Sequence, residues 1–206
     1  MNRRAMFSLL RMLLGVLAPL MLLACSSGSP GGEKPPLEGA ALGGPFTLVD
    51  KNGDTVTWDD LRGEYAIIYF GYTFCPDACP FDVQAMMMGY NRFAKAHPDL
   101  AAKVQPVFIS IDPERDTPKV VGQWTAAFSP RLLGLTGTPD QVKTAADAFA
   151  TYYKKGEETE GGYLMDHSRV AFLMSPEGDP IAMLPVEKGV ADKGAAVAAE
   201  LEKWVR

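Results

Sequence analysis

The feature that most constrains the fold is residues 65–70, six consecutive uncharged residues (YAIIYF). A run that is apolar at every position is expected of a strand buried on both faces. A second such run covers residues 104–111, and between the two, residues 81–96 carry apolar side chains at helical spacing. This order predicts an α/β protein in which a right-handed crossover helix joins two parallel strands.

The rest of the chain continues the alternation of strands and helices. We expect a hairpin at residues 46–57 around Asn52-Gly53, helices at 118–128, 139–150 and 191–205, and strands at 132–135, 170–174 and 181–186. Strand, helix, strand, helix, antiparallel hairpin and closing helix is the order of a thioredoxin-like fold. The predicted fold class is therefore α/β, with a single thioredoxin-like domain and an added N-terminal β-hairpin.

The N-terminus has the pattern of an export signal. A basic start precedes the apolar stretch 12–23, which is too short to span a bilayer as a helix. The stretch ends in Leu22-Leu23-Ala24-Cys25, which resembles a bacterial lipobox. We therefore predict a signal peptide over 1–24, a lipidated Cys25 with a flexible tether over 25–41, and a folded domain over 42–206. An ordinary secretory signal with an incidental cysteine and an uncleaved anchor are the alternatives.

The charge of the chain limits its partners. Its formal net charge is -5, and loss of residues 1–24 would remove three arginines and no acidic residue. We expect no nucleic-acid partner, because a phosphate-binding surface needs clustered lysine and arginine. An acidic protein is also repelled by anionic lipid headgroups, so membrane attachment would depend on the N-terminal lipid.

Two cysteines remain once Cys25 is set aside, and they lie between a predicted strand and a predicted helix. Pro80 suits the first helical position, which puts Cys79 at the helix start, where the helix dipole favours a thiolate; Asp77 opposes this effect. At this spacing, Cys75 and Cys79 can chelate one ion or close into a disulfide. Two thiolates suit Cu(I), with zinc as the usual competitor, and a purely structural disulfide is the alternative.

A neutral imidazole is the natural third ligand for Cu(I) held by two thiolates, and the chain has two histidines. His97 lies at a polar helix end and is expected to be a surface residue. His167 precedes a predicted strand in the loop that faces the dithiol in a thioredoxin-like sheet, so we expect it to be the ligand. Asp166 is expected to orient the His167 ring or to hold its loop, as an outer carboxylate does at many metal sites.

Several motifs together resemble the Sco (synthesis of cytochrome c oxidase) family, also called SenC. The similar segments are Gly44–Asp50, Tyr69–Thr73 leading into Cys75–Pro80, Val107–Pro118, Leu135–Thr138, and Tyr163 with Asp166–Ser168. The resemblance implies a thioredoxin-like, membrane-tethered protein on the extracytoplasmic face of a bacterial membrane, here a periplasmic lipoprotein. It also implies one copper ion per chain bound by Cys75, Cys79 and His167, as Cu(I), with Cu(II) left open.

The resemblance also implies a function in oxidase assembly. Such proteins deliver copper to the dinuclear copper centre of cytochrome c oxidase subunit II, reduce the cysteines of that centre, or do both. The expected partners are therefore subunit II or a copper-donor protein, and the chain is expected to be a copper chaperone rather than an enzyme.

Two other functions are alternatives to the copper chaperone. A thiol–disulfide oxidoreductase would act through Cys75 and Cys79 without transferring metal. A peroxiredoxin-like peroxidase is disfavoured, because Thr73 lies two residues before Cys75 and not three.

The loop 112–116 either lines the site or docks a partner, or is a local turn with an Arg–carboxylate pair. The methionine run 86–88 is expected to fill the core, while Met165 beside His167 is left open.

Overall fold

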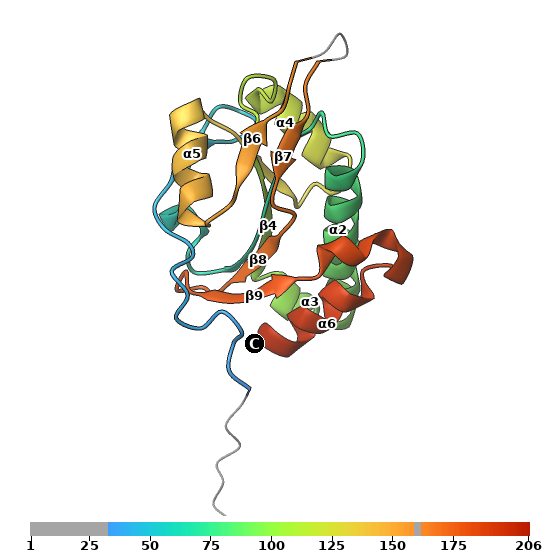
Figure 1. Cartoon of the computed structure of the whole chain (residues 1–206). Helices are drawn as coiled ribbons and strands as arrows, with labels where there is room; N and C mark the ends of the chain where they lie inside the picture. The colour runs from blue at the N-terminus through green and yellow to red at the C-terminus, as the bar shows by residue number, and fades with distance from the viewer. Residues whose placement is uncertain (1–32, 159–161) are drawn as a thin grey trace, which may run out of the picture. The chain divides into compact units, whose positions relative to one another are not determined.

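A computed structural model of the chain describes residues 33–158 and 162–206 (Figure 1). The predicted signal peptide and Cys25 lie outside these residues. Residues Pro35–Arg206 form one compact unit, which begins earlier than the predicted domain start at residue 42. The backbone N–H of Leu37 donates to the carbonyl of Ile181 (3.1 Å), so this part of the predicted tether packs against the sheet. None of the helices in the described residues is both long and apolar enough to span a bilayer.

A five-stranded sheet with the order β5-β4-β3-β8-β9 forms the centre of this unit. Its strands are β3 (Tyr65–Gly71), β4 (Val104–Ser110), β5 (Leu133–Leu135), β8 (Ala171–Met174) and β9 (Pro180–Leu184). Strands β3, β4 and β5 are parallel, whereas β8 pairs antiparallel with β3 and β9 pairs antiparallel with β8. Residues 67–70 of β3 have no exposed surface, as predicted for a strand covered on both faces.

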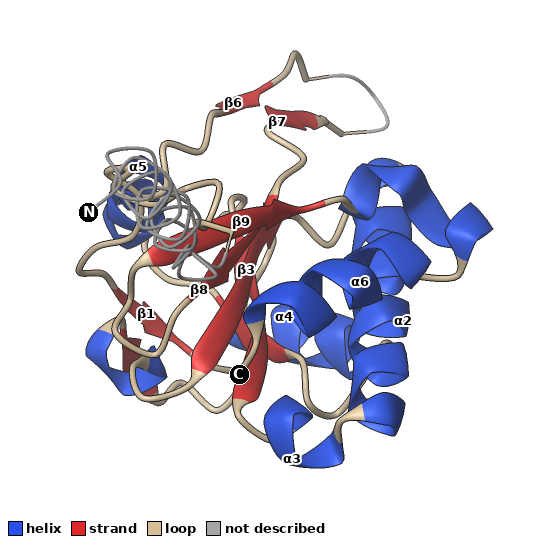
Figure 2. Cartoon of the chain, turned by 90° about the horizontal axis from the view of Figure 1, so that it is seen from below, coloured by secondary structure: helices blue, strands red, loops and turns tan. Residues whose placement is uncertain are grey.

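Helices cover both faces of the sheet. They are α2 (Ala78–Ala96), α3 (Pro98–Ala101), α4 (Pro118–Ala126), α5 (Pro139–Ala148) and α6 (Ala195–Trp204), with short 3₁₀ segments at Asp59–Leu61 and Val186–Asp192. Figure 2 shows α2, α4 and α6 together on one side and α5 with β1 on the other. Thr117 and Thr138 cap α4 and α5 through their hydroxyl groups, and a proline follows each at the first helical position. The architecture is thioredoxin-like, as predicted.

The predicted N-terminal hairpin is present as β1 (Thr47–Val49) and β2 (Thr55–Thr57), which pair antiparallel. Gly53 in its turn has φ +85°, a conformation that glycine adopts without strain. The Asp50 carboxylate accepts hydrogen bonds from the backbone N–H groups of Asn52 and Asp54, which fixes the turn. Val49 forms an isolated bridge with Thr136, which joins the hairpin to the segment after β5.

One element was not predicted from the sequence, an antiparallel ribbon formed by β6 (Tyr153–Lys155) and β7 (Met165–His167). It lies beyond the edge of the sheet in both views, and β7 leads directly into β8 (Figures 1 and 2). Neither strand has an apolar alternation that would have revealed it, because the sequences are only Tyr-Lys-Lys and Met-Asp-His. The ribbon matters for function because it carries His167.

Candidate metal centre

The two cysteines lie where β3 passes into α2. Cys75 is in the connecting loop and is half-buried, whereas Cys79 is in the first turn of α2 and is completely buried. The helix begins at Ala78 with Asp77 as its N-cap residue. Pro80 is therefore the third helical residue, whereas the prediction placed it first. Proline is tolerated there because the first four N–H groups of a helix have no partner within the helix. Neither Cys75 nor Cys79 is in a disulfide.

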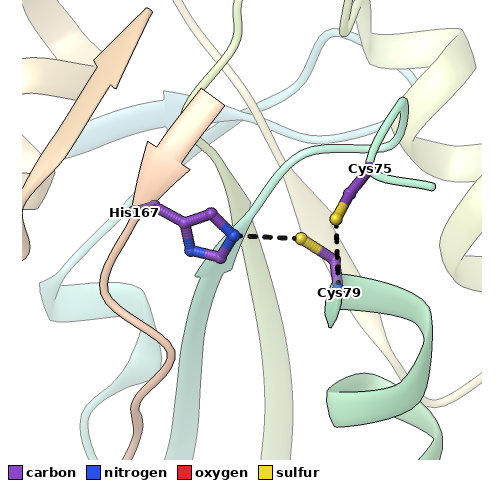
Figure 3. A group of neighbouring side chains, drawn as sticks. All are labelled: Cys75, Cys79 and His167. Atoms are coloured by element: carbon purple, nitrogen blue, oxygen red, sulfur yellow. Dashed lines mark hydrogen bonds between the residues drawn. The ribbon is translucent and has the colours of Figure 1, made fainter. Parts of the chain in front are cut away.

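His167 meets the cysteines from the opposite side (Figure 3). Its Nε2 atom lies 3.2 Å from the Sγ of Cys79, and the backbone N–H of Cys79 donates to the Sγ of Cys75 at 3.3 Å. The two sulfurs and one imidazole nitrogen all lie within 4.8 Å of one another. The structure therefore brings together the three residues predicted to bind metal, from segments 88 positions apart in the sequence.

The orientation of the imidazole ring makes Nε2 the available donor. The Nδ1 atom lies 2.9 Å from the carbonyl oxygen of Ser168. A carbonyl can only accept a hydrogen bond, so Nδ1 carries the proton and Nε2 of the neutral ring keeps its lone pair. The ring also lies edge-on to Tyr69 and Tyr72, with centroid distances of 6.4 and 5.9 Å. A fixed tautomer and a packed ring are typical of a metal-ligating histidine.

Asp166 does not have the expected position. Its side chain is exposed, and in the described parts of the chain it makes no hydrogen bond to His167. Successive residues of a strand face opposite sides, so Asp166 and its partner across the ribbon, Lys154, are not on the side of His167. The backbone of Ser168 orients the ring instead, which the sequence could not reveal because every residue has a carbonyl.

The two thiols differ strongly in acidity. The pKa of Cys75 is lowered to about 3, chiefly by a hydrogen bond from the Cys79 side chain, and the neighbouring His167 side chain and the backbone N–H groups of Cys79 and Asp77 act in the same direction. Partial burial opposes this shift. The pKa of Cys79 is raised by its hydrogen bond to Cys75 and by burial. Cys75 is thus the thiolate, whereas Cys79, the residue that the helix start was expected to favour as a thiolate, is the protonated thiol.

This donor set fits a soft metal ion. Two thiol sulfurs and one unprotonated imidazole nitrogen favour copper or zinc over the hard cations, which prefer oxygen. Cys79 lies in a completely buried position, so water has access mainly from the side of the half-buried Cys75. The site can hold an ion at three points and leave one side open to an incoming ligand.

The loop 112–116, whose role was left open by the sequence, contacts the segment that carries the cysteines. The carboxylate of Asp116 is buried and accepts hydrogen bonds from the Thr73 backbone N–H (3.0 Å), the Thr73 hydroxyl (2.5 Å) and the Ser110 hydroxyl (2.6 Å). Burial raises the pKa of Asp116, although the hydrogen bonds from Ser110 and Thr73 act in the opposite direction. Asp116 thus anchors the start of the segment that leads to Cys75.

The same loop also contacts the ribbon that carries His167. Arg115 lies against the Tyr163 ring, 3.6 Å from its centroid, and its Nη1 donates to the Tyr163 carbonyl at 2.9 Å. Asp112 accepts hydrogen bonds from the Tyr163 hydroxyl (2.7 Å) and from Arg115 (2.5 Å). Glu114 pairs with Lys155 on β6. The loop therefore connects the two segments that carry the site residues, and the local Arg–carboxylate pair is part of that connection.

Other residues singled out from the sequence lie in the core or on the surface. His97 is exposed at the C-terminal end of α2, with its ring against Phe93. Met86 and Met87 are buried in the core, as predicted, whereas Met88 is only half-buried; Met165 is also buried in the core. Sequence reasoning overlooked Asp82, which has no exposed surface and pairs with Arg169. The sequence did contain a clue to Asp82, because it is an acidic residue on the apolar face of the helix, four positions before Met86.

Comparisons with known proteins point to one family. A curated relative, "Protein SCO1 homolog 1, mitochondrial" of Arabidopsis thaliana, is 43% identical over 145 residues, covering 70% of this chain and 42% of that protein. "Protein SenC" of Rhodobacter capsulatus is 41% identical over 138 residues, covering 67% of this chain and 61% of that protein. The chain thus spans about half the length of such relatives.

A solved structure agrees with these relatives. Arabidopsis thaliana ScoI with copper bound superimposes with a TM-score of 0.71 at 38% identity, covering 80% of this chain and 100% of that one. The SCO1/SenC family model matches residues 34–206, which include the whole dithiol loop, the 112–116 loop and the ribbon. The chain belongs to the SCO1/SenC family.

Proposed function

We propose that this protein binds one copper ion through Cys75, Cys79 and His167 and passes it to a partner during assembly of cytochrome c oxidase. The observation that carries the proposal is the convergence of two sulfurs and one unprotonated imidazole nitrogen within 4.8 Å. Similar proteins from Arabidopsis thaliana, Bradyrhizobium japonicum and yeast have been solved with copper bound. Softness of the donors and likeness to copper-bound relatives thus support the same ion.

The three residues would contribute differently to binding. Cys75 is already a thiolate and half-buried, so it suits first contact with an incoming ion. Cys79 keeps its proton in the metal-free protein and would release it on binding, because a metal ion takes the place of a thiol proton. His167 would add its Nε2 without losing a proton, since the proton of the neutral ring is on Nδ1. Binding at neutral pH would therefore release about one proton.

The finer parts of the function rest on the family and on the N-terminal sequence. We infer that the acceptor is the dinuclear copper centre of cytochrome c oxidase subunit II, and that the dithiol also helps to reduce the cysteines of that centre. We further infer export from the cytoplasm and attachment to the outer face of a bacterial membrane through a lipid on Cys25. The lipobox-like Leu22-Leu23-Ala24-Cys25 supports the last point.

The decisive experiment compares the two histidines of the chain. Reduced protein should bind about one equivalent of Cu(I). His167→Ala should weaken binding by about 100-fold or more, because loss of a ligand exceeds the roughly 10–100-fold cost of losing one of its outer partners. His97→Ala is the matched control and should bind as wild type does. Competition with a chromophoric Cu(I) chelator measures all three, and equal affinity of the two variants would remove His167 from the site.

One observation favours a second function, thiol–disulfide exchange without metal transfer. A half-exposed thiolate beside a protonated thiol is the arrangement of an attacking and a resolving cysteine. This function needs no imidazole ligand, so His167→Ala should still reduce a disulfide in a subunit II fragment at the wild-type rate. Exchange that survives in His167→Ala, together with unaltered copper affinity, would favour the oxidoreductase over the chaperone.

A further inference from the structure

A buried carboxylate lies close to the metal centre, three residues after Cys79 on α2. Asp82 in α2 has no exposed surface, and its two oxygens accept three hydrogen bonds. Arg169 donates two of them, from Nε at 2.8 Å and from Nη2 at 2.6 Å, and the hydroxyl of Tyr69 donates the third at 2.9 Å. The carboxylate is thus fully engaged, and it links α2, β3 and the segment between β7 and β8.

Each residue of the ion pair lies close in sequence to one of the proposed metal ligands. Asp82 lies three residues after Cys79 on α2, a spacing that puts both side chains on one face of the helix. Arg169 lies two residues after His167, and its guanidinium contacts α2 three residues along from Cys79, which the His167 ring contacts. The contact between Arg169 and Asp82 therefore runs alongside the 3.2 Å contact between His167 and Cys79.

Stability alone does not account for such a pair. Removing a carboxylate from water is costly, and replacing a buried ion pair by apolar residues is often neutral or stabilising. A bidentate Arg–carboxylate pair, by contrast, fixes both distance and orientation. The Arg169 side chain is 46% exposed and its chain neighbours are half-buried, so the pair fixes a partly exposed segment to a wholly buried point in α2.

We propose that Arg169 is a positioning residue of the metal centre, which holds His167 against Cys79 through its paired hydrogen bonds to Asp82. This inference rests on the proposed copper site. The other hydrogen bonds of the segment 168–169 are those of Ser168 to the backbone of Tyr152 in the ribbon. Without the pair, the His167 ring would leave its place beside Tyr69 and Tyr72 for part of the time. The affinity for the metal would fall with the fraction of time that the ring is displaced.

The test uses Arg169→Ala, Arg169→Lys and the double variant Asp82→Ala/Arg169→Ala. We expect Arg169→Ala to weaken Cu(I) binding by about 10–100-fold, the usual effect of losing an outer partner of a ligand. Arg169→Lys should recover part of the loss, because lysine restores the charge but not the planar fork. The double variant leaves no unpaired buried carboxylate, so it guards against simple misfolding, and it should bind as weakly as Arg169→Ala. Lys143→Ala, which removes an exposed pair with Asp147, should match wild type.

A metal-free measurement separates this inference from the copper proposal. Nuclear Overhauser contacts between the ring protons of His167 and Tyr72 should be present in wild type and weakened in Arg169→Ala and in the double variant. Folded variants that retain these contacts and bind copper within about twofold of wild type would overturn the positioning role. Wild-type protein that shows the ring contacts but no copper affinity would instead contradict the proposed function and leave the positioning role supported.

Discussion

At the scale of single residues, the acidity of Cys75 makes a direct prediction. Its pKa of about 3 means that Cys75 is a thiolate over the whole range from pH 5 to 8. An ordinary thiol with a pKa of about 8.5 gains roughly tenfold in thiolate for each pH unit in that range. In reduced, metal-free protein, the rate of Cys75 alkylation by iodoacetamide should therefore change by less than about twofold from pH 5 to 8. Peptide mass spectrometry measures the rate.

Free cysteine is the reference for this experiment, and its rate should rise by about a thousandfold over the same three pH units. Cys79 is buried and keeps its proton, so it should react far more slowly than Cys75. A rate for Cys75 that climbs tenfold per pH unit would contradict the assignment of the thiolate to that residue.

At this scale, the sequence predicts the role of a residue only where the residue type alone indicates its chemistry. Cys75, Cys79 and His167 were predictable because soft ligands are few in this chain. Arg169 and Asp82 were not, since an ion pair between residues 87 positions apart exists only after α2 and β8 have packed. The orienting carbonyl of Ser168 was beyond prediction for the same reason, because only its place in space distinguishes it from other carbonyls.

At the scale of elements, the ribbon of β6 and β7 depends on the loop 112–116. Its strands have three residues each and little buried surface, and a two-stranded ribbon is marginal without support. The long parallel strands were predicted from apolar runs, but the ribbon was not, because its stability comes from tertiary contacts. Arg115 provides several of these contacts, through the ring and carbonyl of Tyr163 and the carboxylate of Asp112.

Arg115→Ala should therefore loosen the ribbon and leave the sheet intact. Hydrogen bonds to a charged group contribute about 1.5–3 kcal/mol each, so the loss predicts about tenfold or faster hydrogen exchange at the backbone amides of β6 and β7. Amides of β3 and β4 should exchange at the wild-type rate. Hydrogen exchange followed by NMR measures both, and Lys143→Ala on α5 is the control. Equal acceleration in ribbon and sheet would indicate global destabilisation and would contradict a local role for Arg115.

At the scale of the whole molecule, the metal centre lies on a unit that begins at Pro35, and its expected anchor is Cys25. The formal net charge of -8 that remains after loss of residues 1–24 and their three arginines disfavours direct binding to anionic lipids, so the membrane would hold the protein only through its N-terminus. The sequence pattern alone predicts this anchor, since Cys25 lies outside the described residues. A short tether would keep the metal centre close to the membrane and so raise its local concentration near the proposed acceptor, if that acceptor is bound to the same membrane.

The proposed lipid anchor makes Cys25 the residue that would decide attachment. In a bacterial host fed with an alkyne-tagged fatty acid, wild-type protein should become labelled, and the mass of its first peptide should correspond to a lipid-modified chain that begins at Cys25. Cys25→Ser should lose the label, whereas Cys75→Ser, the matched control, should keep it, because that side chain lies in the folded unit beside Cys79. Copper affinity should respond in the opposite way, unchanged in Cys25→Ser and reduced in Cys75→Ser. Label retained in Cys25→Ser would contradict lipid attachment at this residue without touching the copper site, since the two properties belong to different parts of the chain.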